Sequence, residues 1–169
     1  MPLEDYQEFP LNRKEELSHD VRRFVFGLPS KDMRSYTPVD SPMGEVHLIV
    51  KVYRPCEKFP EGGLMSQHLD DLKIQDTQLI KGPKGHLTWY GNGKFSVKPL
   101  GKPLEERKCA QIGMMAGGTG ITPMLQILHD VFREQSYPPV RAKLIFANQT
   151  EDDILVRTEL ETLAKDFPN

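Results

Sequence analysis

The second part of the sequence alternates between apolar segments typical of strands and amphipathic segments typical of helices. From residue 109 onward it reads CAQIGMMA, a glycine-containing turn, PMLQILHDVFRE, AKLIFAN and DDILVRTELETLAKDF. A strand, a helix, a second strand and a second helix in this order predict parallel strands joined by crossover helices. A complete nucleotide-binding domain of this kind usually has about five or six strands. We therefore expect residues 109–167 to form an incomplete α/β domain.

The first hundred residues instead contain short strand-like segments separated by glycine and proline. We expect strands at residues 22–28, 45–53, 77–83 and 86–91. Short strands in this rhythm are typical of a small antiparallel barrel or sandwich.

The segment EVHLIVKVY, residues 45–53, alternates strictly between its two faces. The predicted inward face consists of four apolar residues, Val46, Leu48, Val50 and Val52. The opposite face consists of His47, Ile49, Lys51 and Tyr53. We expect the first face to pack in a core and the second to be free to meet water or a ligand.

Residues 98–108, KPLGKPLEERK, combine proline, glycine and charge without an apolar period. Such a segment predicts an exposed connection between two units. We therefore divide the chain into residues 1–104 and residues 105–169.

Composition excludes several classes of function. The 22 Lys and Arg residues against 24 Asp and Glu residues give a formal charge of -2, which argues against nucleic-acid binding. Cys56 and Cys109 lie in no paired motif, and the histidines share no helical spacing, so we expect no disulfide and no metal. No segment has 18 consecutive apolar residues and no secretory leader is evident, which predicts a soluble cytoplasmic chain without a membrane span.

The glycine-containing turn could bind a phosphate group. From Gly118 the chain reads GTGITP, which has the first two glycines of a dinucleotide-binding fingerprint and Pro123 at the position of the last. The turn follows a predicted strand and precedes a helix, so free N–H groups and the hydroxyls of Thr119 and Thr122 could form an anion site. A tight turn that needs glycine for its backbone conformation is an equally good interpretation.

A second stretch, FPEGGLMSQHLDDL at residues 59–72, places Gly62 and Gly63 before a short predicted helix. The N-terminus of this helix could face a pyrophosphate, with the hydroxyl of Ser66 as an additional donor.

A third stretch, RSYTPV at residues 34–39, is expected to be extended where it leads into Pro38. Arg34 and Tyr36 would share one face of a strand, and Thr37 the other. Arginine suits a phosphate and a tyrosine ring suits stacking on a flat heterocycle. By itself this stretch is more often an ordinary strand end.

Taken together and in this order, the three stretches resemble the NADH-cytochrome b5 reductase branch of the ferredoxin-reductase-type flavoproteins. The resemblance continues through HDVRRFVFGLP, LIVKVY, IKGPKGHLTWYGNGKF and IFANQTEDDILVRTELE, nearly the whole chain. It implies an FAD-binding antiparallel Greek-key β barrel followed by an α/β Rossmann-like NADH-binding domain, both incomplete here. In that family the flavin takes a hydride from NADH and passes single electrons to cytochrome b5.

The resemblance also implies roles for individual residues near the flavin. Arg34, with Ser35 beside it, would bind the FAD pyrophosphate. Tyr36 would lie against the isoalloxazine, and Thr37 would form a hydrogen bond near flavin N5. Lys51 would approach the flavin and the incoming nucleotide, so Thr37 and Lys51 are the residues expected nearest the reaction. No side chain is expected to act as a general base.

The remaining implied contacts are with phosphates and with NADH. One further residue, Ile49, would approach the flavin itself, beside Lys51. The predicted contacts with the FAD phosphates are made by Leu64, Met65 and Ser66. The predicted contacts with NADH and the rear of the flavin are made by Gly117, Gly118, Thr119 and Thr122.

The sequence departs from the family in two places. Met33 is followed directly by Arg34, where the family has a further stretch of roughly two strands with a G-x-P-x-G-Q-H-like segment. A C-G-P-P-P-M-like segment near the nicotinamide has no counterpart in the chain. We therefore expect a shortened form that binds FAD weakly or not at all and that reduces cytochrome b5 slowly.

Two alternatives remain open at this point. The chain could be a non-catalytic truncated isoform that acts as a binding module, or a flavin reductase-type electron-transfer module with another acceptor. For the leading hypothesis we expect a monomer whose partner is cytochrome b5 or a similar small haem protein. Its expected location is the cytoplasm, or the cytosolic face of the endoplasmic reticulum or mitochondrial membranes.

Overall fold

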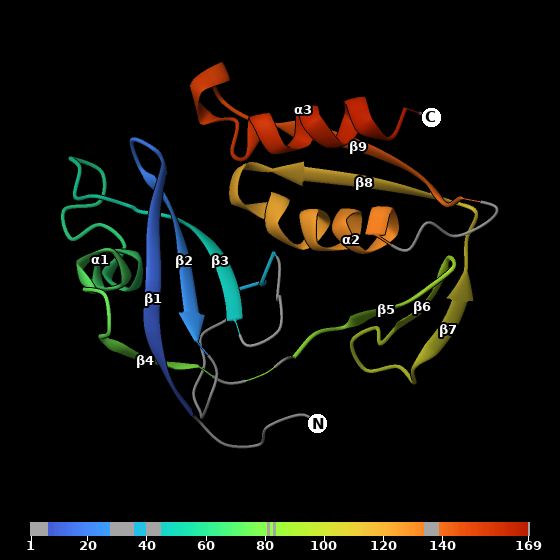
Figure 1. Ribbon diagram of the computed structural model, residues 1–169, viewed down its shortest axis with the longest axis horizontal. Helices are drawn as coiled ribbons and strands as arrows, with labels where there is room; N and C mark the ends of the chain where they lie inside the picture. Colours follow the sequence, from blue (N-terminus) through green and yellow to red (C-terminus); the bar gives the residue numbers. More distant parts are fainter. Residues whose placement is uncertain are drawn as a thin grey trace. The chain divides into compact units, whose positions relative to one another are not determined.

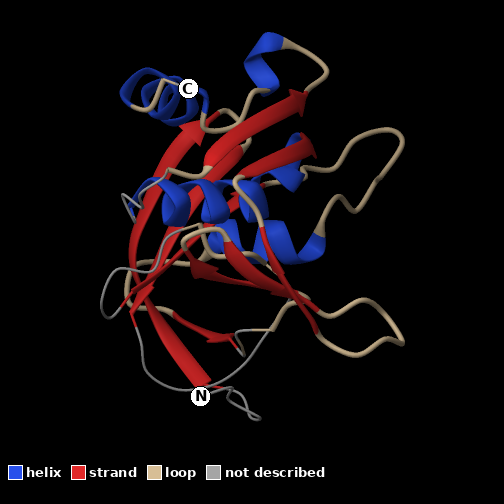
Figure 2. Cartoon of the chain, turned by 90° about the vertical axis from the view of Figure 1, so that its right-hand side faces the viewer, coloured by secondary structure: helices blue, strands red, loops and turns tan. Residues whose placement is uncertain are grey.

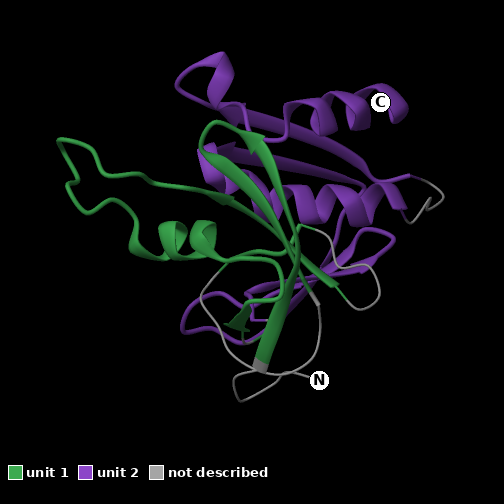
Figure 3. Cartoon of the chain, turned by 60° about the vertical axis from the view of Figure 1, so that its left-hand side comes forward, with its two compact units in different colours: residues 1–83 green, residues 84–169 purple. Residues whose placement is uncertain are grey.

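The computed structural model describes most of the chain and divides it into two compact units, Met1–Pro83 and Lys84–Asn169, which Figure 3 colours separately. The described residues are 7–27, 36–39, 45–80, 82, 84–133 and 139–168. Two of the predicted cofactor-binding residues, Arg34 and Ser35, lie outside the described residues.

The first unit contains a four-stranded antiparallel sheet with the strand order β3-β2-β1-β4 (Figure 1). Its strands are β1 (Gln7–Ser18), β2 (Val21–Gly27), β3 (Glu45–Lys51) and β4 (Thr77–Ile80). β2 and β3 pair from Val21↔Lys51 to Gly27↔Glu45 without a register shift. The predicted strands at residues 22–28, 45–53 and 77–83 are thus confirmed, with slightly different ends.

One face of this sheet packs against helix α1 (Leu64–Asp71), which contributes Leu69 to the core. The buried residues of this core are Phe9, Leu11, Phe24, Phe26, Leu48, Val50 and Leu69. The predicted inward face of β3 is therefore confirmed at Leu48 and Val50.

The other face of β3 is less open than predicted. Ile49, expected to be free, is only 4% exposed. The reason is that Val21 and Val25 of β2 lie opposite Lys51 and His47 and are buried as well. Directly paired residues share a face, so this face has apolar side chains of its own.

Strand β1 was not predicted from the sequence. Five of the twelve residues in its segment QEFPLNRKEELS are charged and one is a proline. Among the residues of this strand whose burial is described, only Phe9 and Leu11 are buried. The strand forms because its first residues pair with β4 and the rest of it pairs with β2. Its stability therefore depends on neighbouring strands and not on its own apolar pattern.

The second unit contains two separate sheets. The antiparallel sheet consists of β5 (Leu87–Gly91), β6 (Lys94–Val97) and β7 (Glu105–Lys108). The parallel sheet consists of β8 (Gln111–Gly117) and β9 (Arg141–Ala147). The antiparallel sheets followed by a parallel α/β unit confirm the predicted fold class, an antiparallel β barrel followed by an α/β Rossmann-like domain, both incomplete.

The predicted connection at residues 98–108 is only partly irregular, because its last four residues form β7, which pairs with β6. The two compact units meet between Pro83 and Lys84, whereas the predicted division between residues 104 and 105 falls just before β7. That division into cofactor-binding domains stays a prediction.

Helix α2 (Ile121–Arg133) follows β8 through the short 3-10 helix η1 (Gly118–Gly120) and packs along β8 and β9 (Figures 1 and 2). Its buried residues are Ile121, Thr122, Leu125, Leu128 and Val131, which form one stripe at helical spacing. The helix begins two residues earlier than predicted, so Pro123 is its third residue and not its first. Proline is tolerated there because first-turn N–H groups have no partner within the helix.

The last predicted helix, residues 152–167, is divided in the structure. A 3-10 helix η2 (Glu151–Asp153) and an irregular segment precede α3 (Arg157–Asp166). Val156 interrupts the helix with a positive φ of 52°. The amphipathic pattern of this segment predicts that Ile154, Leu155, Leu160 and Leu163 face inward. Of these, Leu155 is buried, but α3 itself has no buried residue. A contact of 3.0 Å between Nε2 of His129 and Oε1 of Glu159 joins α2 to α3.

Candidate functional site

The start of α1 lies very close to the segment that follows β3. Gly62 has a φ of +65°, and a Cβ there would lie 2.5 Å from the carbonyl oxygen of Tyr53 and 2.8 Å from the nitrogen of Pro55. Gly63, the N-cap of α1, donates its N–H to the same carbonyl oxygen of Tyr53 at 2.8 Å. The two glycines are therefore needed for a close approach between two backbone segments.

Ser66 connects the same two segments through its side chain. It is 5% exposed, and its hydroxyl accepts the N–H of Tyr53 at 3.1 Å and donates to the carbonyl oxygen of Gly63 at 2.9 Å. The hydroxyl, predicted to contact a phosphate, is thus engaged within the protein. Tyr53 was not recognised from the sequence, because its contribution is made by backbone atoms that any residue possesses.

The first turn of α1 has no side-chain cap. Leu64, its first residue, is 70% exposed. The first N–H groups of a helix have no partner within it and have a partial positive charge from the helix dipole. This end of α1 therefore offers backbone donors suited to an anion.

The structure brings Tyr36 and Met65 together beside the core of the first unit. Both pack against the buried residues of the sheet and line a cavity of about 30 Å³. The other lining residues are Phe26, Leu48, Leu69, Gln78, Leu79 and Ile80. A cavity of this size holds about one water molecule. Thr37, the next residue after Tyr36, is half-buried.

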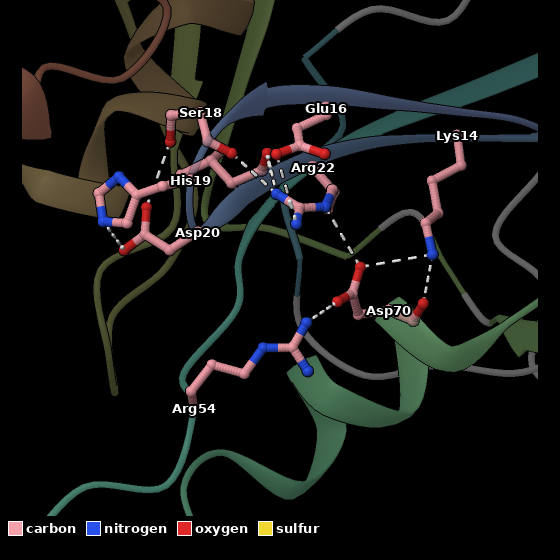
Figure 4. Close-up of polar contacts among 9 residues, drawn as sticks. Lys14, Glu16, Ser18, His19, Asp20, Arg22, Arg54 and Asp70 are labelled. Carbon is pink, nitrogen blue, oxygen red and sulfur yellow. Dashed lines mark hydrogen bonds and ion pairs between the residues drawn. The ribbon is translucent and has the colours of Figure 1, made fainter.

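Lys51 is engaged by a neighbouring carboxylate. Its ammonium lies 3.0 Å from Asp20 in the turn between β1 and β2, and Asp20 also accepts a hydrogen bond of 3.2 Å from Ser18 (Figure 4). Asp20 was not recognised from the sequence, because it lies 31 positions before Lys51. This contact directs the charge of Lys51 toward the β1–β2 turn.

The glycine loop between β8 and α2 is open. Gly118 has a φ of +48°, and a Cβ at Gly117, Gly118 or Gly120 would meet no described atom within 4 Å. The loop therefore does not need glycine to make room for another described part of the chain. Thr119 is exposed, whereas Thr122 is buried and donates its hydroxyl to the carbonyl oxygen of Thr119 at 3.4 Å.

A larger surface hollow of about 470 Å³ lies on the antiparallel sheet of the second unit. Its lining residues are Tyr90, Lys94, Phe95, Glu106, Arg107 and Lys108. This hollow includes none of the predicted site residues. It is lined by one acidic and several basic side chains of a solvated sheet, and we assign no function to it.

Among the described residues three titratable groups have shifted pKa values, and one of them is Arg157, whose hydrogen bonds with Glu161 and Glu151 raise the pKa of its guanidinium. The hydrogen bond between the Glu45 carboxyl and His47, at 3.0 Å, lowers the pKa of that carboxyl. Burial raises the pKa of the Cys109 thiol, which makes it less reactive as a nucleophile.

Within the described ranges no three His, Cys, Asp or Glu side chains are grouped so as to hold a metal ion. None of the helices described in the structure combines the length and apolar character needed to cross a bilayer.

Comparisons with known proteins agree with this arrangement. The family described as oxidoreductase FAD-binding domain matches residues 8–89, and the oxidoreductase NAD-binding domain matches residues 114–169. The chain is 42% identical over 187 positions to NADH-cytochrome b5 reductase 2 of Homo sapiens, covering 95% of this chain and 67% of the relative. The chain belongs to the NADH-cytochrome b5 reductase family. This reductase-family chain is also 47% identical over 186 positions to NADH-cytochrome b5 reductase 2 of Xenopus tropicalis, covering 94% of this chain and 61% of that relative.

A solved structure extends the likeness to the fold of the reductase family. The cytochrome b5 reductase domain of Ulva prolifera nitrate reductase has a TM-score of 0.86 and 36% sequence identity, over 96% of this chain and 70% of that one. The chain thus spans about three fifths to two thirds of its curated relatives. Because 94% of 169 residues is fewer than 186 positions, the Xenopus alignment contains positions without a counterpart in this chain.

Proposed function

We propose that the chain is part of an FAD-dependent oxidoreductase that passes electrons from NADH to cytochrome b5. The observation that carries the proposal is a pair of open backbone sites, each in the unit whose family match names the corresponding cofactor. The uncapped first turn of α1 lies within residues 8–89, and the open glycine loop lies within residues 114–169. The electron acceptor in the proposal, cytochrome b5, is taken from the names of the two relatives.

The first unit would hold the FAD pyrophosphate at the N-terminus of α1. The backbone N–H groups of Leu64, Met65 and Ser66 would bind the phosphate oxygens, because a helix N-terminus favours negative charge. The hydroxyl of Ser66 would act indirectly, by holding the first turn against Tyr53. A bound FAD supplies the redox chemistry, accepting a hydride from a nicotinamide and releasing electrons one at a time.

The RSYTPV stretch would supply the other FAD contacts in the first unit. Arg34 and Ser35 would bind the pyrophosphate, Tyr36 would lie against the isoalloxazine and Thr37 would form a hydrogen bond beside it. The half-buried position of Tyr36 near Met65 supports this assignment, since a partly packed ring is held in a fixed orientation.

The second unit would hold NADH at the glycine loop. A dinucleotide could approach Gly117 and Gly118 closely, because a side chain is absent there and no described atom fills the space. The exposed hydroxyl of Thr119 is available to such a ligand, whereas the hydroxyl of Thr122 already bonds to Thr119 and would help to hold the loop.

Lys51 and Ile49 would act by position on β3 and not by proton transfer. Ile49 is buried and would shield the flavin side of the strand from water. Lys51 would place a positive charge beside the sheet edge while its ammonium stays near Asp20. Hydride and electron transfer need two rings held in contact and no side-chain general base.

The proposal is tested by the visible spectrum of the purified chain after incubation with FAD and gel filtration. In contrast to the weak or absent FAD binding expected from the shortened sequence, we expect retained flavin, because the first turn of α1 that would hold the pyrophosphate is present. Its absorption should bleach when NADH is added and return when oxidised cytochrome b5 is added. A parallel sample with NADPH at the same concentration is the control, and it shows whether the bleaching depends on which nicotinamide nucleotide is added. Flavin that is retained but is not bleached by NADH would contradict the reductase function, and a colourless chain would contradict FAD binding itself.

A further inference from the structure

Three cationic side chains converge on one carboxylate in the last turn of α1. The side chain of Asp70 is only 8% exposed, and its Oδ1 lies 3.3 Å from Nε of Arg22 in β2 and 3.4 Å from Nζ of Lys14 in β1. Its Oδ2 accepts a hydrogen bond from Nη2 of Arg54, in the segment after β3. Figure 4 shows the three side chains pointing at Asp70 from three different elements.

The position of Asp70 is unfavourable for the helix considered alone. A carboxylate in the last turn opposes the helix dipole, and burial of a charge is costly unless it is paired. Asp71 has the same charge in the same turn, but it is exposed. The ion pairs of Asp70 therefore serve the attachment of α1 to the sheet and not the stability of the helix itself.

The partners of Asp70 are themselves held in place. Arg22 also donates to the carbonyl oxygens of Ser18 at 2.8 Å and Val21 at 3.1 Å. Lys14 donates to the backbone carbonyl oxygen of Asp70 in addition to its side chain. Two of the three cations thus fix the carboxylate to the β1–β2 hairpin, and the third, Arg54, connects it to the segment after β3.

The two ends of α1 are fastened by different means. Its N-terminal end is held by the contacts of Gly63 and Ser66 with Tyr53, and its C-terminal end by Asp70. The helix has eight residues and a length of about 12 Å, so movement of one end changes the direction of the N–H groups at the other.

The geometry points to Asp70 as a positioning residue for the FAD pyrophosphate. This inference rests on the proposed function. Asp70 does not touch the cofactor; it fixes the axis of α1, and thereby aims the first-turn N–H groups of Leu64, Met65 and Ser66 at the phosphate oxygens. Loss of its charge releases the far end of the helix and leaves three cations close together.

The test compares Asp70→Asn with Asp71→Asn, which makes the same chemical change one residue away on the exposed side. FAD affinity is measured by titration, and the 31P NMR signals of the bound pyrophosphate are recorded at saturating FAD. We expect the FAD dissociation constant to rise at least about tenfold in Asp70→Asn and less than about twofold in Asp71→Asn. We also expect the 31P signals to move only in Asp70→Asn, and Asp70→Glu to restore part of the affinity.

The 31P signals distinguish positioning from a loss of stability, because saturated protein is folded in every variant. Unchanged signals in Asp70→Asn at saturation overturn the inference, whatever the change in affinity. If Asp70→Asn does not yield folded protein, Arg54→Gln replaces it, with Lys58→Gln as its exposed control. The side chain of Arg54 is 57% exposed, and its removal leaves Asp70 with two cations. A shift of the 31P signals in Arg54→Gln but not in Lys58→Gln supports the inference. The same 31P signals in both variants overturn it.

The same experiment separates this inference from the proposed function. An unmodified chain that binds no FAD overturns both. An unmodified chain that binds FAD, together with an Asp70→Asn variant that binds it with the same affinity and the same 31P signals, overturns only the role of Asp70.

Discussion

The hydroxyl of Ser66 accepts a hydrogen bond from the backbone N–H of Tyr53 at a distance of 3.1 Å. The two residues are 13 positions apart, and the contact fastens the first turn of α1 to the segment that follows β3. A residue expected to contact a ligand directly is therefore part of the support for the backbone donors beside it.

Replacement of Ser66 by alanine should lower both stability and FAD affinity. The change removes two hydrogen bonds near a buried position, so we expect the free energy of unfolding to fall by about 1 to 2 kcal/mol. Thr162→Ala is the control, because it removes an exposed helix hydroxyl that bonds to Thr158. Urea unfolding and FAD titration measure the two effects, and equal losses in Ser66→Ala and Thr162→Ala would contradict the supporting role.

Alanine at Gly62 should be more harmful than alanine at Gly101. Both glycines have a positive φ, +65° and +70°, but a Cβ at Gly101 meets no atom within 4 Å whereas one at Gly62 meets the backbone of Tyr53 and Pro55. We expect about 1 kcal/mol of conformational strain at Gly101 and about 3 kcal/mol in total at Gly62. Urea unfolding of the two variants tests this, and similar midpoints would refute the close approach.

Valine at Gly118 should weaken NADH binding and leave bound FAD unaffected. Gly101→Val is the matched control, since both positions have a positive φ and open space for a side chain. Both variants should lose similar stability, but only Gly118→Val should raise the NADH dissociation constant, by at least about tenfold or 1.4 kcal/mol. Equal NADH affinity in the two variants would show that the glycine loop is only a turn.

Alanine at Arg34 should release FAD more readily than alanine at Lys51. A guanidinium bound to a pyrophosphate makes charge-assisted hydrogen bonds of about 1.5 to 3 kcal/mol each. Lys51 is paired with Asp20, so its removal should cost about 1 kcal/mol or less of stability and little FAD affinity. The flavin content of both variants after gel filtration is the measurement, and equal retention would refute the assignment of Arg34.

The β8-loop-α2-β9 series was predictable because each of its elements has a strong local pattern. The buried stripe of α2 follows a helical period, and the glycines of the loop lie between two apolar segments of the sequence. The inward face of β3 was predictable for the same reason. Such patterns report which residues of one element face a core, and they depend only on neighbours within about ten positions.

Features that depend on distant pairs of residues were decided by the tertiary structure. β1 exists because β2 and β4 lie on either side of it, although five of its own twelve residues are charged. Ile49 is buried because β2 presents Val25 on the same face. Neither result has a signal in the local sequence.

The sequence by itself determined the family, the order of the elements in the α/β part and the three stretches that could bind phosphates. Only the tertiary structure showed that the hydroxyl of Ser66 is engaged by Tyr53, that Lys51 is paired with Asp20 and that Asp70 is surrounded by three cations. The physical reason is that periodicity reflects the partition of side chains between water and a core, which is a local choice at each position. Hydrogen bonds and ion pairs require two groups within about 3 to 4 Å, and that distance is set by how the whole sheet brings separate segments together.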